Sequence, residues 1–77
     1  MLISQIKVYK NNKPLKGVSV SLEFTGFTQM GFTKRFLTNN EGIAYVEHSS
    51  RGRANVYING SNVGSIYTPA EESFYLV

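Results

Sequence analysis

Apolar residues recur at every second position along several stretches of this chain. Residues 18–24 give the clearest example, because they read V-S-V-S-L-E-F. Alternation of this kind is typical of a β-strand that has one buried and one solvated face. The same pattern, with varying regularity, predicts seven strands, at residues 2–10, 18–24, 32–38, 43–48, 53–59, 63–67 and 73–77.

Asn, Gly and Pro separate these stretches. Segments 11–14 and 39–42 read N-N-K-P and N-N-E-G, and Asn59 is followed by Gly60. Asn and Gly tolerate left-handed backbone angles, and Pro14 cannot donate to a sheet ladder, so each segment predicts a turn. Asn59-Gly60 in particular predicts a tight hairpin between strands 53–59 and 63–67.

Short strands at this spacing, without a helical period anywhere, predict an all-β fold. We expect a small antiparallel sandwich of about seven strands that forms a single domain over residues 1–77. The same alternation places Tyr57 and Tyr75 on outer faces of the sheets. The predicted core consists of Ile6, Val8, Val18, Val20, Leu22, Phe24, Val56, Ile58, Phe74 and Leu76.

Length and composition limit what can stabilise this fold. A chain of 77 residues buries a small core, and small domains often add a disulfide, a metal or a partner subunit. The chain has no Cys and a single His, so we expect no disulfide, no metal and no cofactor. Good sheet packing, with or without self-association, is left to hold the fold, and self-association is expected here.

Targeting signals are not evident either. No stretch is apolar for long enough to form a transmembrane helix, and residues 1–5 do not begin a secretory signal. We therefore expect a cytoplasmic protein if this is the full chain; for a processed or excised piece the compartment stays open.

Three segments carry a family resemblance. They are K-P-L-K-G-V-S-V-S-L from Lys13, T-N-N-E-G-I-A-Y-V from Thr38 and R-G-R-A-N-V-Y-I from Arg51. In this order they resemble the carboxypeptidase-regulatory-like and transthyretin-like β-sandwich group, which includes related bacterial Ig-like modules. The resemblance implies an Ig-like or transthyretin-like sandwich. It also implies an accessory, adhesive or carrier role, since members of the group mostly act in that way.

The resemblance extends over nearly the whole chain, but its motifs mainly describe how strands begin and turn. Asn12 stands where the group usually has Gly, and Asn39 stands where it usually has Asp. The missing carboxylate argues against a calcium site at that turn. The positions that match the group's motifs are Pro14, Leu15, Gly17, Val18, Val20, Leu22, Thr38, Gly42, Gly52, Val56 and Ile58.

Two groups of residues invite a catalytic interpretation. His48 follows Glu47, but neighbours on a strand point to opposite faces, so we interpret His48 as a surface or strand-end residue. Glu71 and Glu72 form an acidic pair, which we interpret as the start of a helical turn rather than as an acid and base. We therefore do not expect this protein to be an enzyme.

Basic residues are the better candidates for function. The chain carries a net charge of +3, with Lys34-Arg35 and Arg51-Gly52-Arg53 as its local concentrations. Guanidinium groups and aromatic rings together suit phosphates, bases or an acidic protein surface, and Tyr9, Tyr45 and Tyr57 could supply the rings. The competing interpretation is a solvated basic rim. Because the charge is modest, nucleic acid is not an expected partner.

The expected function is a non-catalytic binding or structural module that acts through a sheet face or an edge strand and self-associates. The alternative is a small intracellular protein that captures an anionic small molecule such as a nucleotide, or inhibits a partner protein, through a basic patch. The expected partner is another protein or a second copy of this chain. Under the alternative it is an anionic small molecule. We do not expect binding to a membrane. The candidate binding residues are Lys34, Arg35, Arg51, Arg53 and Tyr57.

Overall fold

The computed structural model describes residues 2–26, 30–71 and 73–77, and these residues form two β-sheets without a helix. No helix that could cross a membrane occurs in these residues. Where the alternation predicts seven strands, the described residues form nine, because strand 32–38 is split into two and Lys13–Pro14 is added. The strands are β1 (Leu2–Lys10), β2 (Lys13–Pro14), β3 (Ser19–Thr25), β4 (Met30–Phe32), β5 (Phe36–Leu37), β6 (Ile43–His48), β7 (Gly52–Ile58), β8 (Ser61–Thr68) and β9 (Ser73–Leu76).

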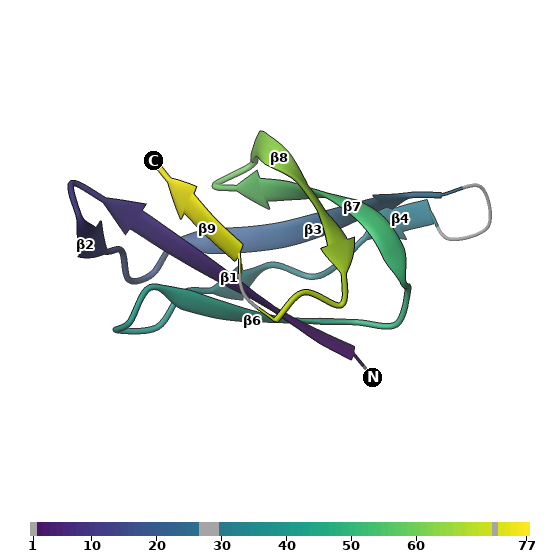
Figure 1. Cartoon of the computed structure of the whole chain (residues 1–77), viewed down its shortest axis with the longest axis horizontal. Helices are drawn as coiled ribbons and strands as arrows, with labels where there is room; N and C mark the ends of the chain where they lie inside the picture. Colours follow the sequence, from purple (N-terminus) through teal and green to yellow (C-terminus); the bar gives the residue numbers. More distant parts are fainter. Residues whose placement is uncertain (1, 27–29, 72) are drawn as a thin grey trace.

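The central strand of the first sheet is β1. It pairs antiparallel with β6 and β2 along one side and parallel with β9 along the other. In the second sheet, β4 and β5 lie along one side of β3, and β7 and then β8 follow on its other side. Figure 1 shows β9 and β8 at the same side of the two stacked layers. The all-β prediction is confirmed, whereas a purely antiparallel sandwich is wrong because β9 runs parallel to β1.

The inner faces of the two sheets meet in one core. Eight of the ten predicted core residues are buried there, and Phe74 and Leu76 are the exceptions. Strands β6 and β7 add the residues that the prediction omitted, Ile43, Ala44, Val46 and Ala54. Short alanine side chains at Ala44 and Ala54 leave space for their larger neighbours, as close packing requires.

Strand β9 turns the opposite set of side chains to the core from the set that the alternation predicted; we call this choice of face its phase. Its register places Phe74 beside Lys7 and Leu76 beside Tyr9, and paired residues in a sheet share a face. Phe74 and Leu76 are therefore 59% and 80% exposed, while Tyr75 lies beside Val8 and packs against the core. Burial also raises the pKa of Tyr75. The predicted outer position of Tyr75 is wrong for the same reason.

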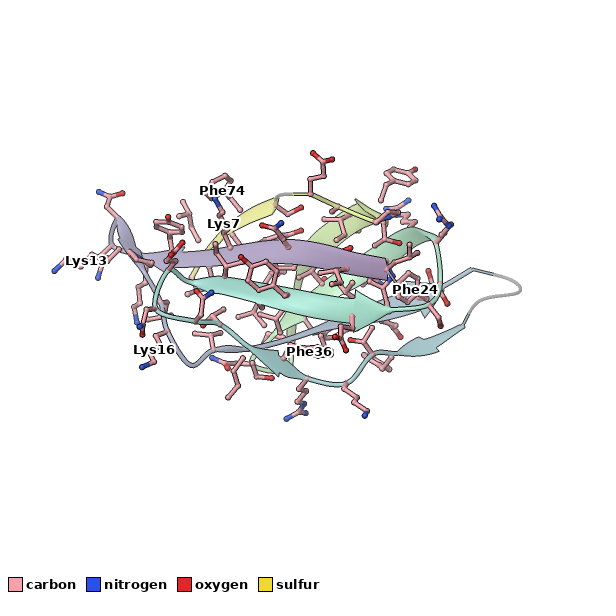
Figure 2. The ribbon with its side chains drawn as sticks, turned by 90° about the horizontal axis from the view of Figure 1, so that it is seen from below. Lys7, Lys13, Lys16, Phe24, Phe36 and Phe74 are labelled. Atoms are coloured by element: carbon pink, nitrogen blue, oxygen red, sulfur yellow. The ribbon has the colours of Figure 1, made fainter. Side chains whose placement is uncertain are left out.

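Outside the core, Phe74 contacts residues of β1. Figure 2 labels it next to Lys7, whose amine lies 5.1 Å from the centre of the Phe74 ring. The Tyr9 ring is 5.9 Å from the same ring, centre to centre.

The predicted turns are confirmed. Asn11, Asn12 and Asn59 have positive φ angles of 52°, 64° and 51°, as Asn in tight hairpins often does. Pro14 follows the first turn on the two-residue strand β2 instead of ending the turn. A strand that short at the margin of a sheet loses little from the missing N–H of proline.

Candidate functional site

The side of the second sheet formed by β4 and β5 is interrupted. Between these strands, residues 33–35 leave the ladder of β3. Thr33 replaces the missing ladder contacts: its N–H donates to the Leu22 carbonyl (2.8 Å), and its hydroxyl oxygen accepts from the Leu22 N–H (3.0 Å). The hydroxyl proton goes to the carbonyl of Lys34 (2.8 Å). Both backbone groups of Leu22 therefore keep a hydrogen-bond partner at the break. The break also places Lys34 and Arg35 in different surroundings.

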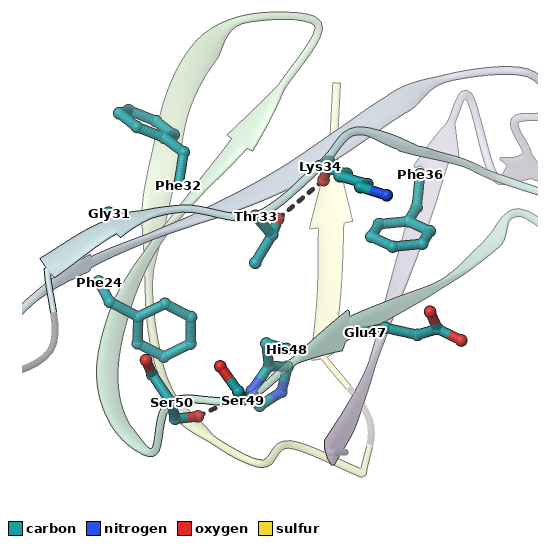
Figure 3. Close-up of a pocket in the computed structure, with 10 residues that line it drawn as sticks. All are labelled: Phe24, Gly31, Phe32, Thr33, Lys34, Phe36, Glu47, His48, Ser49 and Ser50. Carbon is teal, nitrogen blue, oxygen red and sulfur yellow. Dashed lines mark hydrogen bonds between the residues drawn. The ribbon is translucent and has the colours of Figure 1, made fainter.

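A hollow of about 350 Å³ opens between this interrupted side and the end of β6. We call it the edge hollow. Figure 3 shows the Phe24 ring and His48 on one side of it and segment 31–36 on the other. The Phe24 and His48 rings lie 5.4 Å apart, centre to centre. Its lining residues are Phe24, Gly31, Phe32, Thr33, Lys34, Phe36, Glu47, His48, Ser49 and Ser50.

His48 is fixed by hydrogen bonds at both ring nitrogens. Its Nδ1 lies 2.8 Å from the Ser50 carbonyl oxygen, which can only accept, so Nδ1 carries the proton. Nε2 then accepts from the Ser4 hydroxyl at 2.8 Å, and the Ser4 oxygen accepts from the Ala70 N–H at 3.0 Å. His48 ends β6, as expected, but it is only 5% exposed, so its prediction as a surface residue is wrong.

Ser4 and His48 are as close together as a catalytic nucleophile and its base, but the Ser4 hydroxyl is not accessible from the surface. Ser4 is fully buried, and its hydroxyl is occupied by His48 and Ala70. A nucleophile has to reach the reacting atom of a substrate, so this geometry serves packing and not attack. Among the described residues, no three His, Asp or Glu side chains form a possible metal site. Glu72, the second member of the acidic pair, lies outside the described residues.

Strand β6 offers backbone hydrogen-bonding groups next to the edge hollow. The Val8 N–H donates to the Gly42 carbonyl, so in this register the backbone groups of Ala44, Val46 and His48 point toward β1. Those of Tyr45 and Glu47 consequently point the other way. Within the described part of the chain, β6 pairs with β1 alone. Beside the hollow, then, the outer edge of β6 carries donors and acceptors at alternate residues.

A second hollow of about 400 Å³ lies on the outer face of the second sheet, and we call it the face hollow. Phe32 and Thr33 line both hollows, so segment 31–36 separates them. Here the Phe32 and Tyr57 rings meet edge to face, 5.3 Å apart. The lining residues are Ser21, Phe32, Thr33, Arg35, Tyr57 and Gly60.

Tyr57 is held in place by the carboxylate of Glu23. The Tyr57 hydroxyl donates to Glu23 Oε1 at 3.1 Å, and the Asn55 amide donates to the same oxygen at 3.2 Å. The hydrogen bond to Glu23 is the main cause that raises the pKa of Tyr57, and burial and the Glu23 charge act in the same direction. The neutral phenol is therefore the form that this arrangement favours.

The candidate binding residues are divided among several surfaces. Lys34 lines the edge hollow, while Arg35 and Tyr57 line the face hollow together. Arg51 and Arg53 line neither; Arg53 lies opposite Tyr67 on β8 and donates to the Ser65 hydroxyl at 3.4 Å. The suggested aromatic partners Tyr9 and Tyr45 lie on the outer face of the first sheet, on β1 and β6.

Sequence reasoning missed Phe24, Phe36 and His48 as residues of one hollow. They come from three segments that are distant in sequence, and only the break after β4 brings Phe36 across from His48. Gly31 and the irregular alternation of residues 32–38 were the available signals for a break.

Compared with known protein families, curated proteins and solved structures, the chain has no significant match to any family model, protein or structure. The resemblance to the carboxypeptidase-regulatory-like and transthyretin-like sandwiches therefore stays a prediction.

Proposed function

We propose that this domain is a non-catalytic binding module that captures an extended segment of a partner protein along the outer edge of β6. The observation that carries the proposal is the edge hollow directly beside that strand. Added strands gain affinity from backbone hydrogen bonds and specificity from pockets for alternate side chains. Here Tyr45 and Glu47 would supply the backbone groups, and the hollow would take one apolar side chain.

The lining of the hollow indicates which segment would fit. The rings of Phe24 and Phe36 favour an aliphatic or aromatic side chain, and His48 already has partners for both nitrogens. Lys34 and Glu47 stand at the lining with opposite charges, so neighbouring polar residues of the segment can meet either one. The Ig-like or transthyretin-like classification belongs to the same proposal, and it rests on the turn and strand motifs quoted above.

Peptides selected from a random display library on the intact domain would test this proposal. We expect selected peptides to share one large apolar residue, to protect the amides of Tyr45 and Glu47 from hydrogen exchange, and to shift the Phe24 and Phe36 signals. Ser49→Trp should abolish binding, because Ser49 is exposed and lines the hollow, so the indole fills it without entering the core.

Ser61→Trp is the matched control, since Ser61 is an exposed serine that lines neither hollow. The proposal fails if the library yields no binder, or if S49W and S61W bind the selected peptides equally well.

The alternative, capture of an anionic small molecule, is favoured by one observation, the joint presence of Arg35 and two aromatic rings in the face hollow. A guanidinium beside aromatic rings suits a nucleotide, although the nearby Glu23 carboxylate opposes any anion. AMP binding that Arg35→Ala weakens, and that added salt also weakens, would support this alternative. Retention of full affinity in the variant would exclude it.

A further inference from the structure

Strand β8 forms the outer edge of the second sheet, on the side opposite to the edge hollow. Among the described strands it pairs with β7 alone. Its eight residues, Ser61–Thr68, include no charged residue and no proline. Natural sheets usually protect an exposed edge with charges, prolines or bulges, because an unprotected edge can pair with another strand.

The one protective feature of β8 lies at its start. Val56 pairs with Gly64 and Tyr57 with Asn62, so Val63 is an extra residue in a bulge. From Gly64 to Thr68 the ladder is regular. This part of the strand therefore has no irregularity that would prevent another strand from pairing along its outer edge.

The register also fixes which backbone groups face outward. The Asn59 N–H donates to the Ser19 carbonyl, so Asn55 and Tyr57 direct their backbone groups to β3, and Ala54 and Val56 direct theirs to β8. Ile66 and Thr68 accordingly point toward β7, while beside the bulge the Gly64 N–H donates to Asn62 Oδ1 at 3.0 Å. Ser65 and Tyr67 are left with their N–H and C=O groups turned to the outer edge.

We propose that β8 pairs antiparallel with β8 of a second copy of this chain about a twofold axis at Ile66. That axis places Ser65 opposite Tyr67 of the other copy, so the outward groups of both residues meet in reciprocal hydrogen bonds. Residues close to a twofold axis lie near their own copies, and like charges near one another are destabilising. An uncharged strand is suited to this arrangement, whereas β6, with Glu47, is less so.

The side chains agree with the same pairing. Tyr67 is 76% exposed in the single chain, and it would lie against Ser65 of the second copy. Arg53 already reaches Ser65, so its guanidinium would come close to that Tyr67 ring, a favourable contact for a cation. Ile66 packs partly against the core and would meet Ile66 of the second copy at the axis.

Amide hydrogen exchange together with sedimentation from micromolar to millimolar concentration tests the pairing. In the dilute monomer the amides of Ser65 and Tyr67 should exchange fast, while those of Ile66 and Thr68 are protected. In the concentrated sample, which should contain dimer, Ser65 and Tyr67 should become protected as well. A monomer at every concentration overturns the proposal, and so does a dimer in which these two amides remain fast.

Two matched variants test whether β8, and not another surface, forms the dimer interface. Tyr67→Lys places one added positive charge from each copy on the same face, diagonally across the axis from each other, and should weaken dimerisation by at least about tenfold. Leu76→Lys makes a similar charge change at an equally exposed residue of the first sheet and should leave dimerisation unaltered. The reverse result would assign the interface to the outer face of the first sheet and overturn the proposal. Peptide capture at β6 protects Tyr45 and Glu47 instead, so the two proposals can fail separately.

Discussion

Individual residues with left-handed backbone angles determine where this chain reverses direction. Gly17 and Gly42 have φ angles of +77° and +75°, and Asn11, Asn12 and Asn59 share the same region. These residue types are recognisable in the sequence because few others adopt such angles at low cost. The available space around them is not recognisable in the same way. A Cβ at Gly42 would lie 2.7 Å from the Val8 carbonyl oxygen, whereas a Cβ at Gly17 would meet no atom within 4 Å.

Replacement of these two glycines separates backbone strain from steric conflict. Gly17→Ala should lower the free energy of unfolding by about 1 kcal/mol, the cost of a left-handed alanine. Gly42→Ala adds a collision with backbone atoms, and we expect a loss of about 3 kcal/mol. Urea denaturation of both variants measures the difference. Equal losses would show that the turn at Gly42 relaxes freely.

At the scale of the element, alternation predicts which residues share a face but not which face is buried. In residues 18–24 one set of side chains is apolar and the other polar, so the choice is clear and the prediction is correct. In the predicted strand 73–77 both sets contain large apolar residues: Phe74 and Leu76 on one face, Tyr75 and Val77 on the other. Parallel pairing with β1 decides between them, and a pattern with period two contains no information on that pairing.

The phase of β9 can be tested by truncating neighbouring side chains. Tyr75→Ala should lower the free energy of unfolding by about 2 kcal/mol, because the ring packs against the core. Leu76→Ala should change it by less than about 0.5 kcal/mol, because the side chain is exposed. Urea unfolding curves of the two variants decide the matter. A larger effect at Leu76 would mean that β9 has the phase that the alternation predicted.

At the scale of the whole molecule, hydrogen bonds at Ala70 tie one of the connections between the two sheets to β1. This connection leads from β8 to β9, and its Ala70 N–H donates to Ser4 while its carbonyl accepts from the Gln5 N–H at 2.9 Å. Ser4 also donates to His48 at the end of β6. One buried hydroxyl therefore joins β1, β6 and the crossover, next to the open side with the edge hollow.

Removal of this hydroxyl should loosen the crossover. Ser4→Ala leaves the Ala70 N–H and His48 Nε2 without their partner, and we expect a loss of about 1–3 kcal/mol in the free energy of unfolding. The amide of Val77, bonded to the Tyr9 carbonyl, should also exchange faster as β9 detaches more often. Ser61→Ala, at an exposed serine, should alter neither quantity. Unchanged exchange at Val77 in S4A would show that the crossover is held by other contacts.

The chain by itself determined the elements and most of the core. Period-two alternation, the left-handed Asn and Gly residues and the lack of any helical period are local properties, so they can be recognised from neighbouring residues alone. The tertiary structure decided the rest: the parallel pairing of β9, the break at Thr33, the burial of His48, and the gathering of Phe24, Phe36 and His48 around one hollow. These features depend on contacts between segments far apart in the chain, and a local pattern cannot specify which distant segment becomes the neighbour.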